Sequence, residues 1–164
     1  MSTSNTAGEP ITQEGLAALK SEIGQLETEA RREIAAKILT ARGHGDLKEN
    51  AEYHAAKEEQ AHLETRIHRL RQRLRAAVVV ETKIEDDTFS FARVAEIRDE
   101  GTGELHTWTI VGATEADHAR GKLSAESPVA RALLGHAVGE TVEVRTPKGV
   151  RRLKIERFVE SPAA

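Results

Sequence analysis

Apolar residues recur every three or four positions between residues 12 and 77, in two stretches separated by Gly43 and Gly45. This spacing is typical of amphipathic helices that pair along a coiled-coil seam. The two glycines favour a reversal of the chain between the two stretches. We therefore expect two antiparallel helices of about 30 residues, roughly 45 Å long. The seam positions are Leu16, Leu19, Ile23, Leu26, Ala30, Ile34, Ile38 and Ala41, followed by Ala56, Gln60, Leu63, Ile67, Leu70, Leu74 and Ala77.

The pattern changes after residue 77, where β-branched residues and partial alternation indicate strands. One short helix is well marked, because Ser127 suits the N-cap, Pro128 the first helical position and Gly135 the exit. The sequence thus predicts a small α+β domain after the hairpin. Strands are expected at 78–80, 105–111, 141–146 and 150–159, with turns at 99–103 and 146–149.

The expected domain organisation follows from these patterns. Residues 1–10 are small and polar and predict a disordered tail, residues 11–77 form the coiled-coil hairpin with its tip near 43–50, and residues 161–164 form a second tail. Residues 78–88 hold the first strand and a linker that includes the acidic run Glu85, Asp86 and Asp87. The C-terminal domain then spans 89–160. The fold class is α+β.

Composition removes several classes of function. Cysteine is absent, which excludes disulfides, thiolate chemistry and cysteine-bound zinc. Aromatic residues make up 3% of the 164 residues and the net charge is −3, so neither base stacking nor overall attraction to nucleic acid is indicated. No signal peptide or apolar run of membrane-spanning length is visible, so we expect a cytoplasmic protein without membrane association.

The segment between the two predicted helices carries the candidate chemistry. Asp46 and Glu49 lie three positions apart, so both carboxylates could share a face at the start of the second helix. One interpretation is structural, with Asp46 as N-cap and Glu49 completing a capping box. The other is a magnesium site completed by a partner, because magnesium in proteins often takes only one or two carboxylates and leaves its other positions to water or phosphate. Spacing alone leaves both open.

Two stretches of this chain resemble signatures of the bacterial Gre transcript cleavage factors. Residues 45–60 (GDLKENAEYHAAKEEQ) are similar to the family's tip signature, closer to the GreA branch than to GreB. Residues 127–135 (SPVARALLG) are similar to its C-terminal signature. The resemblance extends over residues 11–159, with both motifs in the family's order.

The resemblance implies a transcription elongation factor that acts through bacterial RNA polymerase and is not itself an enzyme. Such factors insert the hairpin into the secondary channel and stimulate the polymerase's own cleavage of backtracked RNA near its 3′ end. Asp46 and Glu49 would be the catalytic tip pair that holds Mg²⁺ jointly with the polymerase. The C-terminal domain would be FKBP-like, with Ser127 and Pro128 contacting the polymerase. The factor would act as a monomer and meet DNA only through the transcription complex.

Other basic and histidine residues give weaker signals. Lys57 falls where the family implies an RNA-phosphate contact, although we would expect arginine there. Residues 66–75 contain five arginines and no acid, which indicates either a solvated helix face or a surface for RNA or polymerase. Over residues 11–77, 12 basic side chains balance 11 acidic ones, which favours the GreA-like branch. The histidines at 44, 54, 62 and 68 show no zinc-site spacing.

Two rival functions remain open for such a chain. The first is a regulator that occupies the same channel and inhibits transcription without promoting cleavage. The retained pair Asp46 and Glu49 argues against it, since a plug has no need of both carboxylates. The second is a prolyl isomerase or chaperone that uses the hairpin as a clamp, for which the domain offers few aromatic residues.

Overall fold

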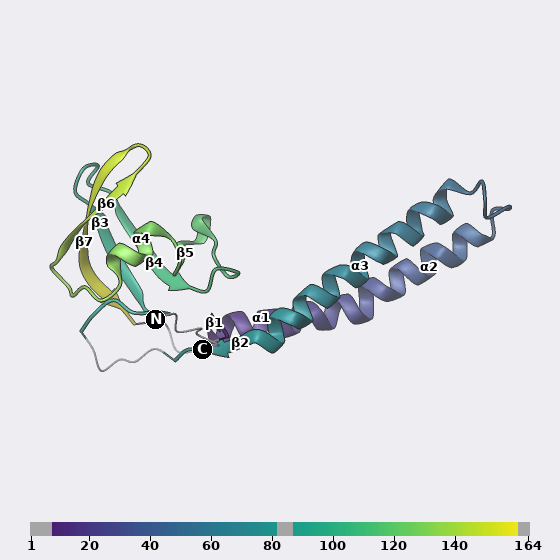
Figure 1. Ribbon diagram of the computed structural model, residues 1–164, viewed down its shortest axis with the longest axis horizontal. Helices are drawn as coiled ribbons and strands as arrows, with labels where there is room; N and C mark the ends of the chain where they lie inside the picture. The colour runs from purple at the N-terminus through teal and green to yellow at the C-terminus, as the bar shows by residue number, and fades with distance from the viewer. Residues whose placement is uncertain (1–7, 82–86, 161–164) are drawn as a thin grey trace, which may run out of the picture. The chain divides into compact units, whose positions relative to one another are not determined.

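The computed structural model describes residues 8–81 and 87–160 (Figure 1). It divides into two compact units, one of Glu14–Ala77 and the other of Met1–Gln13 together with Val78–Ala164. The predicted fold class, a helical hairpin followed by a small α+β domain, is confirmed. Among the described residues, no helix is both long and apolar enough to cross a membrane.

The first unit is the hairpin. Its first arm consists of α1 (Gln13–Gln25), the π-helical segment η1 (Leu26–Ala30) and α2 (Arg31–Arg42), and its second arm is α3 (Ala51–Ala76). Figure 1 shows α2 running beside α3, with the connecting loop at one end of the hairpin. Apolar residues from both arms form its buried seam, with Leu26, Ala30 and Tyr53 packed against it. The central buried residues are Ile34, Ile38, Ala56, Leu63 and Ile67.

The π-helical segment differs from the continuous α-helix that we expected. From Leu26 to Ile38 the seam residues are spaced by three successive steps of four. In a regular α-helix, which turns about 100° per residue, those 12 positions make three full turns and roughly 120° more. The seam would then point away from the second arm. A π turn accommodates one additional residue. Because η1 lies at this point, Ile34 and Ile38 return to the buried face.

Ion pairs between the arms account for part of the basic run. Arg66 Nη2 lies 2.5 Å from a carboxylate oxygen of Glu22, and Arg71 pairs with Glu27. Towards the tip, Arg31 donates to Glu64 at 2.8 Å. The three arginines are exposed and their carboxylate partners are exposed or half-buried, so each pair stabilises the hairpin by no more than about 1 kcal/mol. Two of the five arginines are thus engaged by the hairpin itself, which favours the structural interpretation of the run.

The start of the chain corrects one prediction. Glu9 and Pro10, placed in a disordered tail, belong with Ile11 to strand β1 (Glu9–Ile11), which pairs with β2 (Ala77–Val79). Ile11 is buried, and its carbonyl accepts the Val80 amide at 3.1 Å. A three-residue strand whose partner lies more than sixty positions away leaves no local pattern to detect. Residues 1–7 of the predicted tail lie outside the described residues.

The second unit contains a five-stranded mixed sheet in the order β5-β4-β3-β7-β6. Only β4 and β5 run parallel, and the other neighbours are antiparallel. The predicted bounds of β4 and β6 are confirmed and those of β7 differ by one residue, whereas β3 and β5 were not predicted. The strands are β3 (Val94–Asp99), β4 (Leu105–Val111), β5 (Lys122–Ser124), β6 (Thr141–Thr146) and β7 (Gly149–Val159).

The missed strand β3 lies at the centre of the sheet. It buries Ala95 and Ile97, while Glu96 and Arg98 lie on the other face. Those two charges are paired with β7, Glu96 with Arg157 at 2.7 Å and Arg98 with Glu156 at 2.9 Å. Three of its six residues, Ala95, Glu96 and Asp99, are of types that are depleted in strands, so the segment has weak strand propensity when it is considered alone. The partners that compensate these charges lie about sixty residues further along the chain.

Helix α4 (Pro128–Leu133) covers one face of this sheet (Figure 1). Its predicted start and exit are confirmed, because the Ser127 hydroxyl accepts the Ala130 amide at 3.2 Å and Gly135 has φ of +82°. Ala130 and Leu133 are fully buried in the same core as Ile97 and the β7 residues. The short helix η2 (His118–Arg120) precedes β5.

The predicted linker is only partly described. Glu85 and Asp86 lie outside the described residues, whereas Asp87 is exposed. Phe89 is 1% exposed, and its amide donates to the His136 carbonyl at 2.8 Å. The Gly135 amide donates back to the Phe89 carbonyl at 2.9 Å. The chain is therefore anchored in the second unit from Phe89 onward.

Candidate functional site at the hairpin tip

The tip is an eight-residue loop, 43–50, between the end of α2 and the start of α3. Gly43 ends α2 with an ordinary right-handed backbone, whereas Gly45 has φ of +119° and supplies the conformation that other residues rarely adopt. The amides of Gly43 and His44 donate to carbonyls in the last turn of α2, each at 3.1 Å. The reversal thus depends on Gly45 rather than on both glycines.

The structural interpretation of the pair, in which Asp46 and Glu49 form a capping box, is wrong. Helix α3 begins at Ala51, and its N-cap is Asn50, whose Oδ1 accepts the Tyr53 amide at 3.1 Å. Asp46 and Glu49 therefore lie in the loop before the helix. The physical reason is that the Asn50 amide nitrogen also donates to the Ala41 carbonyl, at 2.6 Å. An aspartate at the cap has no hydrogen to donate to that carbonyl.

The loop brings the two tip carboxylates to one shallow hollow. Asp46 and Glu49 are both exposed, and Asp46 Oδ1 accepts the Lys48 amide at 3.1 Å in an Asx turn. Both residues line the hollow with His44, Asn50, Ala51 and Glu52. Both residues therefore lie at one hollow of the tip, in a loop rather than on one face of a helix.

Glu52 is a third acid at this hollow that we did not single out from the sequence. Its carboxylate lies 3.9 Å from His44 Nε2, and both side chains are exposed. It stands six residues after Asp46, and the continuing three-residue spacing was the available signal. Within residues 8–81 and 87–160, no group of three or more His, Asp or Glu side chains is arranged to hold a metal ion.

Tyr53 and Lys57 lie away from the acidic pair. Tyr53 packs on the hairpin seam, and the Arg42 guanidinium lies 5.9 Å from its ring centroid. Lys57 is exposed and donates to Gln60 at 3.0 Å. Tyr53 thus has a packing role, and Lys57 does not line the tip hollow.

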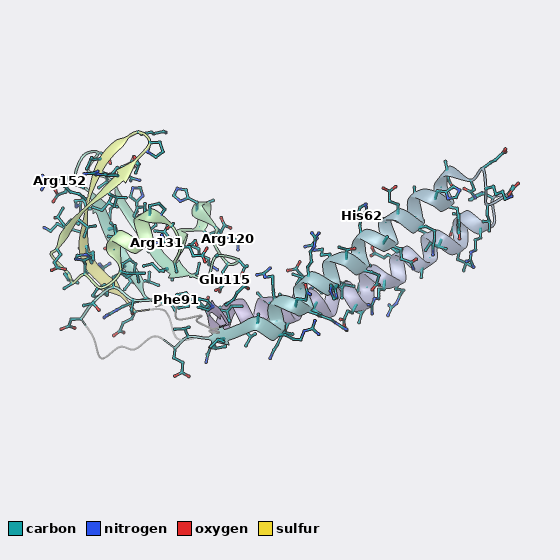
Figure 2. All side chains as sticks on the ribbon, viewed as in Figure 1. His62, Phe91, Glu115, Arg120, Arg131 and Arg152 are labelled. Atoms are coloured by element: carbon teal, nitrogen blue, oxygen red, sulfur yellow. The ribbon has the colours of Figure 1, made fainter. Side chains whose placement is uncertain are left out.

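Ser127 and Pro128 belong to the other unit, where they begin α4. The Ser127 hydroxyl is used as the helix cap, and Pro128 is exposed. Arg131, labelled in Figure 2, is an exposed residue of the same helix. The predicted docking residues therefore have a structural role in starting α4, and they leave a proline and an arginine accessible on its surface.

Two family models match almost all of the described chain. The model for the N-terminal part of transcription elongation factors matches residues 9–79, and the model for the C-terminal part of GreA/GreB transcription elongation factors matches residues 84–158. The chain belongs to the GreA/GreB family of transcription elongation factors. The resemblance inferred from the two sequence motifs is confirmed.

Relatives of this Gre factor agree with the assignment. A transcription elongation factor GreA of Bradyrhizobium sp. strain BTAi1 is 47% identical over 149 residues, covering 90% of this chain and 94% of the relative. A GreA of Geobacillus kaustophilus is 45% identical over 147 residues, covering 89% and 93%. The crystal structure of GreA factor homolog 1 of Thermus thermophilus is 28% identical and covers 93% of this chain and 99% of its own, with a TM-score of 0.41. The family assignment depends on the sequence matches.

Proposed function

We propose that this Gre factor stimulates the intrinsic endonucleolytic activity of bacterial RNA polymerase on backtracked nascent RNA and so returns arrested complexes to elongation. The observation that carries the proposal is the pair of exposed carboxylates, Asp46 and Glu49, facing one hollow at the end of a hairpin in a transcription elongation factor. Family membership supports action in transcription elongation, and the tip supports the particular activity.

The hairpin has the length needed to carry its tip into a narrow channel. Helix α3 has 26 residues, which corresponds to about 39 Å at 1.5 Å per residue. Its apolar seam and the ion pairs between the arms keep the two helices together. This geometry fits entry into the polymerase's secondary channel, where the RNA 3′ end of a backtracked complex is extruded.

The tip residues fit a magnesium ion that is shared with the polymerase. Asp46 and Glu49 supply carboxylate oxygens, which magnesium prefers, and a single pair leaves most positions for other ligands. Both side chains are solvent-exposed, so they reach a partner without rearrangement of the hairpin. When bound, the ion supplies positive charge opposite the phosphate oxygens of the RNA. Asp46 and Glu49 orient and hold it, while the polymerase provides the remaining active centre.

The other predicted contacts divide the work between the two units. Ser127 and Pro128 at the start of α4 contribute polymerase docking, and Lys57 contributes a weaker contact to RNA phosphate. DNA is met only within the transcription complex, and the factor works as a cytoplasmic monomer. The isolated chain has no catalytic role of its own in this proposal, because the reacting centre belongs to the polymerase.

A transcript cleavage assay tests the proposal. Adding the factor to an arrested elongation complex with labelled RNA is expected to shorten the RNA from its 3′ end and to allow extension when nucleotides are added. Polymerase with intrinsic cleavage alone is the control. Binding to the polymerase without any RNA shortening would contradict cleavage stimulation and would favour the rival, a channel-binding inhibitor.

Magnesium binding by the isolated factor is expected to be weak. Two exposed carboxylates without further protein ligands do not overcome the cost of dehydrating the ion. Titration calorimetry of the unmodified factor is expected to show no saturable site at micromolar magnesium. The double variant Asp46→Asn, Glu49→Gln is expected to give the same trace. A tight one-to-one site that this double variant loses would show that the factor binds the ion without the polymerase.

A further inference from the structure

Asn50 joins the two ends of the tip loop through one carboxamide. Its Oδ1 accepts the Tyr53 amide at 3.1 Å and caps α3, and its Nδ2 donates to the Ala41 carbonyl at 2.6 Å. Ala41 lies in the last turn of α2 and is 3% exposed. The Ala41 carbonyl also accepts the His44 amide at 3.1 Å, so the Asn50 bond uses the second lone pair of this oxygen. A single side chain thus fixes the start of α3 against the end of α2.

His54 holds the middle of the same loop. Its Nε2 lies 3.2 Å from the Lys48 carbonyl oxygen, which can only accept, so Nε2 is the donor. The Lys48 amide is held from the other side by Asp46 Oδ1 at 3.1 Å. Both peptide groups next to Lys48 are therefore bonded. Lys48 stands between Asp46 and Glu49 in the loop, so these bonds limit how far the two carboxylates can move apart.

We infer that Asn50 and His54 are positioning residues for stimulated RNA cleavage, holding Asp46 and Glu49 in the arrangement that grips the shared cation. This inference rests on the proposed function. The pair of carboxylates is exposed on a loop, and a loop without such anchors samples many arrangements, at a cost in ordering when it binds. Small displacements of positioned groups lower reaction rates strongly. Asn50 and His54 order the tip loop before it reaches its partner.

Selective variants separate positioning from helix capping. Asn50→Ser keeps a good N-cap acceptor but has no amide to reach Ala41. His54→Ala removes the bond to the Lys48 carbonyl, whereas His54→Gln retains an N–H donor at the end of its side chain. His62→Ala is the matched control, because His62 is an exposed α3 residue paired with Glu58 at 3.7 Å (Figure 2). It stands eight residues after His54, about 12 Å along the helix.

The experiment measures RNA cleavage in arrested complexes over ranges of factor and magnesium concentration. Asn50→Ser and His54→Ala are expected to lower the saturating cleavage rate about tenfold. The factor concentration at half-maximal effect should stay unchanged, and the magnesium requirement should rise. His54→Gln should restore the rate, and His62→Ala should match the unmodified factor. Helix content by circular dichroism checks that each variant is folded.

The outcomes distinguish this inference from the proposed function. If the unmodified factor stimulates cleavage and the Asn50→Ser and His54→Ala variants do so equally well at every magnesium concentration, the positioning roles are overturned. The proposed function is not affected by that result. A raised half-maximal factor concentration at an unchanged saturating rate would assign these residues to docking and would also overturn the inference. No stimulation by the unmodified factor would refute the proposed function, and the positioning roles would fail with it.

Discussion

Replacing Asp46 with asparagine or Glu49 with glutamine is expected to lower stimulated RNA cleavage about 100-fold or more while leaving polymerase binding intact. Each change removes one negative charge from the group proposed to grip the cation, and losing a positioned charge-stabilising group commonly has an effect of this order. Asparagine keeps an Oδ1 acceptor for the Lys48 amide, so the Asx turn is preserved. The change therefore tests charge rather than loop shape.

Cleavage rates and polymerase affinity should be measured for the same variants. Glu58→Gln is the matched control, since Glu58 is an exposed acid on α3 that pairs with His62 rather than facing the tip hollow. It should cleave like the unmodified factor. Competition with labelled factor reports binding separately. Undiminished cleavage by Asp46→Asn and Glu49→Gln would remove the proposed role of the acidic pair.

Replacing Asp99 with alanine is expected to lower the free energy of unfolding of the C-terminal unit by about 1–3 kcal/mol, because the half-exposed Arg151 side chain can be solvated. Asp99 is 3% exposed, and its Oδ2 accepts from Arg151 Nε at 2.9 Å. Its Oδ1 accepts the Gly101 amide at 2.9 Å and the Thr102 amide at 3.3 Å, which fixes the turn between β3 and β4. Alanine would leave these donors without their acceptor.

Urea denaturation followed by tryptophan fluorescence measures this effect, because Trp108 is buried in the same unit. Glu143→Ala is the control, since Glu143 pairs with Arg152 at 3.8 Å but is mostly exposed. That change should alter the free energy of unfolding by less than about 1 kcal/mol. A similarly small effect of Asp99→Ala would show that the hydrogen bonds and the half-buried ion pair of Asp99 contribute little to stability.

The same group gives the stability a pH dependence. Hydrogen bonding to Arg151, followed by the Gly101 and Thr102 amides, holds the pKa of Asp99 below its ordinary value of 3.8. A carboxyl whose pKa is lowered by folding stabilises the native state above the unfolded value, and the contribution is lost as the pH falls through the folded value. Unmodified protein should therefore lose stability in acid more steeply than Asp99→Ala.

Local signals in the sequence predicted much of the fold. Helix α4 has a serine cap, a proline at its first position and a glycine at its exit, all within nine residues, and its bounds followed from them. Strands β4 and β6 contain enough β-branched residues to be located individually. The seam residues predicted the hairpin for the same reason, because each helix carries its own period.

Features that depend on distant partners were not predictable in this way. The charged residues of strand β3 are compensated by Arg157 and Glu156 of β7, which lie far along the chain. Strand β1 can be recognised as a strand only through its pairing with β2. At the tip, Asp46 and Asn50 are both good cap residues, and the sequence does not say which one is used. The choice depends on Ala41, nine residues earlier, whose carbonyl the Asn50 amide reaches.

The π-helical segment η1 also bears on how the length of the first arm can change. Losing one residue within Leu26–Ala30 would convert the widened turn to ordinary α-helix and keep Ile34 and Ile38 directed at α3. Losing one residue within α2 would instead rotate everything beyond it by about 100° and swing the acidic loop around the hairpin axis. A deletion of one residue in this arm is therefore neutral for tip orientation within the five residues of η1 and disruptive nearer the loop.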